Sequence, residues 1–453
     1  MKRMIVVLAG VLLISSVRAQ QQGALQPTGQ AETPQFMFYE AINLVDQDST
    51  QSRIDIPYRV DNNFFIAVKN TEPSLQSPFM RRGEVLIELL DKNGISKARD
   101  INRFTIPAFS TESVPEEKNW YHGIASFSVV PGEYTIVFEI DDLESERKFL
   151  ERNKKIGAVH FSGSSLRTST PIFVQTVRND TLALQNFGGN IGFGSTASLY
   201  LQLYSDALVA EPVRVEYTIS TQPFMFQDPK VMVSDTINQL PLMLHTRPEV
   251  VSAGNAAPSY VPTPDENAKN TAAILISLGA EKLPLRPFEL EMRIMQGTLS
   301  ATVKKPFLMV WPEMPSSLRD VDFAFEALRH ITRECEYESL LRGSRDARLR
   351  NLEEFWKRKD RTPDTDYNEV MVEYYRRVDY TMRAFSSMKG GDGYKTDRGK
   401  IYILYGPPTK TERSLDPNAG FQEVWLYEKQ ARRFVFRDQA RSGNYTLVAT
   451  QNL

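Results

Sequence analysis

The stretch that decides the fold of the C-terminal part of this chain is Gly390-Gly391-Asp392-Gly393-Tyr394-Lys395-Thr396-Asp397-Arg398-Gly399-Lys400-Ile401-Tyr402-Ile403-Leu404-Tyr405-Gly406-Pro407-Pro408. Its first half is rich in Gly, Thr and Asp, which form turns because Gly tolerates positive φ and the Thr and Asp oxygens bond nearby backbone N–H groups. Its second half is an apolar run that ends at a glycine and two prolines. The pattern predicts a turn that leads into a β-strand over residues 400–405.

This stretch resembles the GWxTD-domain family of exported bacterial proteins. Gly393-Tyr394-Lys395-Thr396-Asp397 is the name-giving pentapeptide, with Tyr394 where the family usually has Trp. Other landmarks of the resemblance are Phe355-Trp356-Lys357-Arg358-Lys359-Asp360, Thr362-Pro363, Tyr374-Tyr375-Arg376-Arg377-Val378 and Tyr405-Gly406-Pro407-Pro408. The resemblance extends over residues 349–448 and implies no established biochemical activity.

The segment 393–399, called the GWxTD block below, allows two interpretations. In the structural one, Thr396 and Asp397 bond backbone N–H groups of the turn, Gly399 adopts positive φ, and Tyr394 covers the edge of a core. In the functional one, Tyr394, Asp397 and nearby Arg side chains form a docking surface for a partner protein. The candidate docking residues are Gly393, Tyr394, Lys395, Thr396, Asp397, Gly399, Tyr405, Gly406, Pro407 and Pro408.

The C-terminal domain, residues 312–453, is predicted to be α+β, with three helices and a small antiparallel sheet. A helix beginning near Ser317 would carry an apolar stripe that ends at Cys335, a second helix would cover residues 349–356, and a third would open with a capping box from Asp366 to Glu369. Strands are expected at residues 400–405, 424–427, 433–436 and 445–448.

The larger, N-terminal part of the chain is predicted to be mainly β. Short alternating or apolar runs separated by turn signals, for example 84–90 and 134–140, predict an antiparallel, Ig-like β-sandwich over residues 35–178. Runs at 197–204, 213–219, 273–276 and 288–294 predict a second sandwich over residues 179–311. Within it, residues 246–270 are rich in Pro, Ala, Asn and Ser and are expected to form a long loop that is either mobile or functional.

The N-terminus has the layout of a cleavable signal peptide over residues 1–19. Lys2 and Arg3 precede an apolar run from 4 to 14, and Val17-Arg18-Ala19 precedes Gln20. The alternative, a membrane anchor, needs about 20 apolar residues, which this run does not reach. We therefore expect a flexible lead over residues 20–34, no transmembrane segment after cleavage, and a periplasmic or extracellular protein.

Composition narrows the classes of partner. The 453 residues suffice for three domains, and 54 basic against 56 acidic residues give a net charge of -2, which argues against a nucleic-acid partner. Cys335 is the single cysteine, so no disulfide forms within the chain.

No catalytic residue, cofactor or metal is predicted. The chain has no Gly-x-Ser-x-Gly, P-loop or His-Glu-x-x-His sequence. Cys335 is expected to be a buried, inert thiol. A solvated helix face is favoured over a metal site for the set Glu326, His330, Glu334 and Glu338.

These observations favour a non-catalytic, extracytoplasmic interaction or scaffold protein of the bacterial cell envelope, whose partners are other exported or envelope proteins. The alternative is a carbohydrate-binding or glycan-processing envelope protein. Glycan processing requires a pair of carboxylates that face one substrate. Convergence of Asp397, Glu423 and Asp438 in one cleft would favour it.

Overall fold

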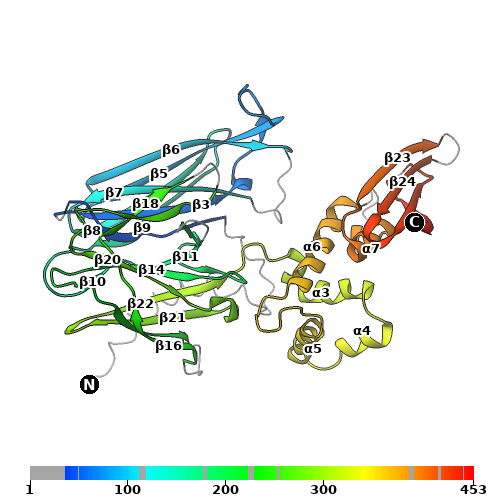
Figure 1. Ribbon diagram of the computed structural model, residues 1–453. Coiled ribbons are helices and arrows are strands. Elements are labelled where there is room, and N and C mark those ends of the chain that lie inside the picture. Colours follow the sequence, from blue (N-terminus) through cyan, green and yellow to red (C-terminus); the bar gives the residue numbers. More distant parts are fainter. Residues whose placement is uncertain are drawn as a thin grey trace, which may run out of the picture. The chain divides into compact units, whose positions relative to one another are not determined.

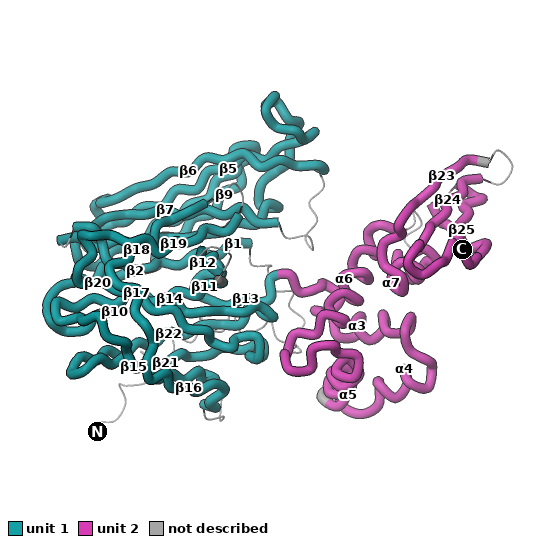
Figure 2. Tube along the Cα trace, viewed as in Figure 1, with its two compact units in different colours: residues 1–312 teal, residues 313–453 magenta. Residues whose placement is uncertain are grey.

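A computed structural model describes residues 36–48, 50–111, 119–176, 181–222, 229–252, 256–386, 392–416, 420–441 and 443–453. The predicted signal peptide and flexible lead, residues 1–34, lie outside the described residues. The chain divides into two compact units, residues 1–312 and 313–453 (Figure 2). Unit 1 is built of strands, and unit 2 combines helices with a small antiparallel sheet, so the predicted fold class, mainly β with a C-terminal α+β region, is confirmed.

The first half of unit 1 forms two antiparallel sheets with an apolar core between them. In one sheet, β3 (Ser52–Asp61) pairs with β7 (Trp120–Val129) and with the short strands β1 (Met37–Tyr39) and β2 (Ile42–Val45). The other has the order β4 (Val68–Lys69), β5 (Phe79–Leu90), β8 (Gly132–Asp142) and β9 (Lys148–Ala158), and β6 (Ser96–Ala108) also pairs with β5. Alternate residues of β5, such as Val85, Ile87 and Leu89, are buried in this core, as period-2 geometry requires.

The second half of unit 1 forms two further sheets. One contains, in order, β17 (Met243–Leu244), β20 (Thr271–Ser277), β14 (Ser198–Tyr204), β11 (Ile172–Thr176), β12 (Leu182–Leu184), β19 (Ser259–Pro264) and β18 (Thr246–Val251), with β10 (Arg167–Thr168) beside β14. The other has the order β13 (Ile191–Gly192), β22 (Leu299–Val310), β21 (Pro287–Gln296), β15 (Val213–Thr221) and β16 (Val231–Leu240). A second core, which includes Leu201, Val215 and Leu290, lies between them.

A third apolar cluster joins the two pairs of sheets. Ile42 and Leu44 of β2 pack with Ile172, Tyr200 and other residues of the eight-stranded sheet. The sheets of unit 1 therefore stack as four layers with three apolar interfaces (Figure 1).

Buried polar contacts reinforce the middle interface of this stack. The hydroxyl of Tyr260, on β19, donates to Asp55 Oδ2 at 2.7 Å, and Asp55 on β3 also pairs with Arg53 at 2.6 Å. Asp55 is fully buried, so loss of its charge would leave two partners unsatisfied in the interior.

The long loop expected over residues 246–270 is replaced, in its described part, by a β-hairpin. Strands β18 and β19 pair in register from Thr246↔Pro264 to Val251↔Ser259. Pro248 is tolerated because β18 ends the order of its sheet, where a missing N–H is not costly, and Pro262 and Pro264 lie beyond the part of β19 that pairs with β12.

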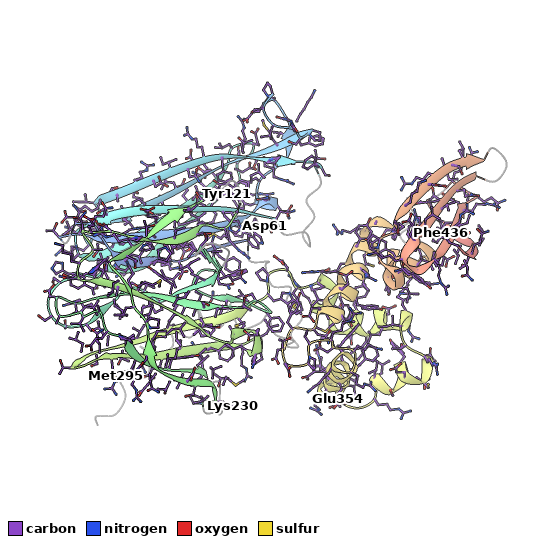
Figure 3. The ribbon with its side chains drawn as sticks, in the orientation of Figure 1. Asp61, Tyr121, Lys230, Met295, Glu354 and Phe436 are labelled. Carbon is purple, nitrogen blue, oxygen red and sulfur yellow. The ribbon has the colours of Figure 1, made fainter. Side chains whose placement is uncertain are left out.

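Unit 2 contains the helices α2 (Ser316–Arg319), α3 (Val321–Ala327), α4 (Glu334–Leu340), α5 (Arg345–Lys357), α6 (Glu369–Ala384) and α7 (Asp397–Tyr405). Its sheet has the order β23 (Lys410–Asp416), β24 (Gly420–Tyr427), β25 (Arg432–Asp438) and β26 (Thr446–Asn452). Phe436 of β25, labelled in Figure 3, packs in a small core with Phe385, Ile401 and Trp425, which joins helices and sheet.

The strand predicted at 400–405 is wrong, because these residues form helix α7. Thr396 caps its start, and Gly406, with φ of 78°, ends it. A short apolar run is compatible with either a helix or a strand, and here the two caps decide. The strands expected at 424–427, 433–436 and 445–448 are confirmed by β24, β25 and β26, and β23 after the two prolines completes the sheet.

The single helix predicted from Ser317 to Cys335 is also wrong. The carboxylate of Asp320 accepts from the N–H groups of Asp322 and Phe323 and starts a new helix, α3. A 3-10 turn, η4 (Leu328–His330), follows before α4. Cys335 therefore leaves the apolar stripe and is exposed.

The predicted second and third helices exist, with one change at a cap. Helix α6 is capped by Asn368, whose side chain accepts from Met371 N at 2.9 Å, rather than by Asp366. The side-chain amide of Asn368 also donates to Trp356 O at 2.9 Å, which ties the start of α6 to the end of α5. That second bond explains why Asn rather than Asp carries the cap.

Candidate functional site

The GWxTD block forms a 3-10 turn, η5 (Gly393–Lys395), followed at once by α7. The Thr396 hydroxyl donates to Gly393 O at 2.7 Å and accepts from Gly399 N at 3.0 Å. Asp397 lies in the first turn of α7, where a negative charge is favoured by the helix dipole. These bonds make the block a turn and a helix start built from its own residues.

Both glycines of the block are required by close backbone contacts. A Cβ atom on Gly393 would lie within 3.0 Å of the Thr381 carbonyl in α6, and one on Gly399 would lie within 3.0 Å of the Gly393 carbonyl. The positive φ expected at Gly399 is wrong, since this residue lies in the first turn of α7. Its small size, rather than its conformational freedom, allows the turn to pack on the helix.

Tyr394 is an anchor in the core of unit 2. Its residue is 2% exposed, and its ring packs edge-on against Phe323 at 5.1 Å and His330 at 5.7 Å between centroids. Burial raises the pKa of Tyr394 to about 12. The ring therefore offers very little surface to a partner protein.

Lys395, the variable position of the motif, reaches the surface beside this anchor. Its ammonium pairs with Glu326 at 2.7 Å and Asp392 at 2.9 Å. The ion pair with Lys395 lowers the pKa of Glu326. Both carboxylates belong to the lining of a shallow depression of about 420 Å³, formed by Asp320, Asp322, Phe323, Glu326, Met382, Asp392 and Tyr394.

Asp397 links helix α7 to the last strand of the sheet. Its Oδ2 accepts from Leu447 N at 2.9 Å on β26. Within the described residues β26 pairs with β25 alone, so this bond covers one backbone donor on the outer side of β26. The Asp of the motif thus serves the sheet as well as the helix.

The other two carboxylates proposed for glycan processing are also bonded within the fold. Glu423 accepts from Arg398 Nη1 at 3.1 Å and from Trp425 Nε1 at 2.8 Å, and Asp438 accepts from Gly443 N at 2.7 Å. Both residues are buried, with 3% and 2% of their surface exposed. Asp397, Glu423 and Asp438 therefore border the same small sheet, but each has a structural hydrogen-bond partner.

The end of α7 is held by three contacts around Gly406. Gly406 N donates to Tyr402 O at 2.7 Å, and Tyr427 Oη donates to Gly406 O at 2.9 Å. Arg377 Nη1 donates to the Ile403 carbonyl at 3.2 Å, which places a positive charge at the helix C-terminus. Of the remaining candidate docking residues, Pro407 is exposed, whereas Tyr405 and Pro408 are half-buried.

Sequence reasoning misses the residues that surround the block, because they lie far from it in the chain. Phe323 and His330 pack on Tyr394, while Arg377 holds the end of α7.

The four residues considered as a metal site, three glutamates and one histidine, are divided between α3, η4 and α4. Among the described residues, no group of three or more His, Cys, Asp or Glu side chains could hold a metal ion. No described helix has the length and apolar character needed to cross a membrane.

Comparison with known proteins identifies the C-terminal region. Residues 295–452 match the family model of the GWxTD domain, a longer segment than the predicted resemblance over 349–448. The match begins in β21 of unit 1 and includes nearly all of unit 2. A comparison of the sequence with curated proteins gives no match.

Solved structures show only remote likeness. The chain is similar to Escherichia coli alpha-2-macroglobulin activated by porcine elastase, at 9% identity over 59% of this chain and 22% of that chain, with a TM-score of 0.16. The native conformation of E. coli alpha-2-macroglobulin gives 10% identity over 62% and 16%, with a TM-score of 0.14. A structure described as manganese lipoxygenase of Gaeumannomyces graminis and part of zonadhesin of Komagataella pastoris gives 11% over 60% and 94%, with a TM-score of 0.14. Scores this low carry no argument about function.

Proposed function

We propose that this chain, whose residues 295–452 match the GWxTD domain, is a non-catalytic interaction protein of the bacterial cell envelope. It docks other exported proteins by adding an extended segment of the partner to an open edge of a sheet. The signal-peptide layout of residues 1–19 supports export to the periplasm or the cell surface.

The observation that carries this proposal is the edge strand β16. In the described part of the chain, β16 pairs with β15 alone and ends the order of its five-stranded sheet. Its ten residues include one charged residue, Asp235. An edge strand with unpaired N–H and C=O groups is a template for a further strand, and this one lacks the charges that usually discourage pairing.

The long strand β9, at the end of its own sheet, is protected by charge. It carries Lys148, Glu151, Arg152, Lys154 and Lys155. Strand β16 instead has Val231 exposed, while Met232, Val233 and Ile237 pack partly against the core. The difference favours β16 over β9 as the docking strand.

One backbone donor of β16 bonds to a side chain of the same strand. Thr236 N–H donates to Oδ1 of Asp235 at 2.7 Å. An incoming strand that offers a carbonyl to Thr236 would replace that local bond. The preferred occupant is an extended, largely uncharged segment of an exported protein, because β16 offers a single charged side chain, Asp235, to pair with.

Glycan processing at Asp397, Glu423 and Asp438 has less support, since each carboxylate already accepts a hydrogen bond from the protein. A general acid or nucleophile needs a carboxyl group that faces the substrate. The polar side chains of the GWxTD block likewise bond to groups of the protein itself, which favours the structural interpretation of the block.

The proposal is tested by site-specific photo-crosslinking in the native envelope. A photoreactive residue at position 236 should give discrete adducts with exported proteins, whereas the same residue at position 155 on the charged strand β9 should not. Thr236→Pro removes the Thr236 N–H from the edge strand. It should abolish the complexes that these adducts identify, while circular dichroism stays unchanged. Equal adducts at both positions, or complexes that survive Thr236→Pro, would count against docking at β16.

A further inference from the structure

One face of the open edge strand β16 looks into the core of the second sandwich. Residues that lie directly opposite each other on antiparallel strands point to the same side of the sheet. Three residues of β16 lie opposite three buried core residues of β15: Val233 opposite Ile219, Asp235 opposite Tyr217, and Ile237 opposite Val215. Val233, Asp235 and Ile237 are therefore on the core side of the sheet.

Two apolar rows of side chains run across this sheet and end at β16. One row contains Leu290, Ile219 and Val233, and the other contains Ile294, Val215 and Ile237. The residues on β21 and β15 are fully buried, whereas Val233 and Ile237 at the edge are only partly buried. A strand added to β16 would continue both rows, and apolar side chains on it would cover Val233 and Ile237.

The row between these two ends in a charge. It contains Met292, Tyr217 and Asp235, and Asp235 is exposed at its end. One carboxylate oxygen of Asp235 accepts from Thr236 N, and within the described residues Asp235 has no ion-pair partner. An apolar side chain added beside Asp235 would remove water from this charge without giving it a partner, which is unfavourable. An ammonium or guanidinium group there would compensate the charge.

We propose that β16 selects partner segments in which a lysine or an arginine stands between two apolar residues at alternate positions, with the cation opposite Asp235. The proposal rests on strand docking at β16 and adds the chemistry of the partner. Such a segment needs only one charge, in agreement with the single charged residue of β16. A charge that points inward from an edge strand discourages indiscriminate pairing, so Asp235 disfavours segments that lack the cation.

Three synthetic peptides that differ only at their central residue test the proposal. Each has the sequence Thr-Val-Thr-X-Thr-Val-Thr, with Lys, Gln or Glu as X, and carries a terminal photoreactive group. The yield of crosslinks to β16 in the purified protein, measured over a range of peptide concentrations, reports the affinity. Since cross-strand ion pairs are modest in strength, we expect the Lys peptide to bind about three to ten times more tightly than the Glu peptide. Added salt should reduce this preference.

Variants of Asp235 assign the preference to this carboxylate. Asp235→Asn should make the Lys and Glu peptides bind alike, and Asp235→Lys should reverse their order. Asp235 is exposed, so both variants should fold as the parent protein does. Glu216→Gln is the matched control, because Glu216 of β15 lies opposite Thr236 and therefore on the other face of the sheet. It should keep the preference of the parent protein.

The outcomes separate the choice of partner from strand docking itself. If the three peptides crosslink equally to β16, or if Asp235→Lys still prefers the Lys peptide, the proposed partner chemistry is wrong and docking at β16 stands. If none of the peptides crosslinks to β16, the proposed partner chemistry is overturned and docking at β16 loses its support as well.

Discussion

The two units of this protein differ in the contacts that stabilise each of them internally. In unit 1, layers are joined by contacts between residues far apart in the chain, such as the bond from Tyr260 to Asp55 across 205 positions. In unit 2, the turn of the GWxTD block is closed by contacts between neighbours, such as Gly399 to Thr396 across three positions, and its two glycines lie close to backbone atoms. The stacking of layers in unit 1 therefore depends on buried hydrogen-bond partners. The packing of the GWxTD block depends on its two glycines, which have no side chain.

The sharpest test of this comparison is Gly393→Ala. The added Cβ meets the Thr381 carbonyl of α6, and because backbone cannot move as a side chain can, we expect a loss of more than about 4 kcal/mol of unit 2 stability. Calorimetry should show the transition of unit 2 lost and that of unit 1 retained.

Gly157→Ala, in β9, is the matched control, since nothing lies within 4 Å of its added Cβ. It should leave both transitions in place. A Gly393→Ala protein with normal melting would show that η5 can move away from α6.

The next largest effect is expected in unit 1. Asp55→Ala leaves Arg53 and the Tyr260 hydroxyl without their buried partner, which should cost about 3–5 kcal/mol in chemical denaturation of unit 1. Glu291→Ala removes an exposed ion pair with Lys304 and should cost less than about 1 kcal/mol. Equal losses would mean that the interlayer bond does not hold the stack.

Acid should weaken unit 1 through His122. Burial, with Arg59 as a secondary cause, lowers the pKa of His122 from 6.5 to about 4. Below pH 6.5 the unfolded chain takes up a proton that the folded chain refuses until about pH 4, so stability falls as the pH drops through this window. The loss approaches about 3 kcal/mol, at about 1.4 kcal/mol per pKa unit.

Denaturant melts of the parent and His122→Gln between pH 7 and pH 4 measure this contribution. The difference in unfolding free energy between the two proteins should change across the window, because other groups titrate alike in both. A constant difference would show that His122 has the same pKa in the folded and the unfolded protein.

A smaller effect is expected at the cap of α7. Thr396→Ala removes the oxygen that accepts from Gly399 N and should lower unit 2 stability by about 1 kcal/mol. Thr396→Ser keeps that oxygen and should recover most of the loss. If Thr396→Ser lowers the stability of unit 2 as much as Thr396→Ala does, the methyl group of Thr396, rather than its hydroxyl, stabilises the block.

The smallest effect is expected at Cys335. It is exposed on α4, so Cys335→Ala should change stability by less than about 0.5 kcal/mol. Alkylation of the folded protein should modify it at a rate near that of a small thiol. Protection from alkylation would place Cys335 in a buried environment.

The strands of unit 1 are well predicted from sequence. Runs such as 84–90 and 134–140 alternate because one face of a strand is buried whatever its neighbours are, and they lie in β5 and β8. The face-to-face stacking of the sandwiches is not predicted, because Ile42 and Leu44 reveal only that they are apolar and not which sheet covers them.

The candidate sites are less predictable. The motif is evident in the sequence, but the neighbours of Tyr394 come from α3 and η4, some 60–70 positions earlier in the chain. The row of side chains that ends in Asp235 contains Tyr217 of β15 and Met292 of β21. In both cases the residues that lie together in the fold are far apart in the chain, so no local sequence pattern predicts that they meet.

The sequence by itself determined the alternating strands, the division between β-rich and helical regions and the GWxTD motif, because these depend on residues close together in the chain. Only the tertiary structure decided that residues 400–405 are a helix, that Cys335 is exposed, and that Asp397 binds β26. Caps, close backbone contacts and buried charge pairs select among local conformations of similar energy, and their partners are brought together only when the chain folds.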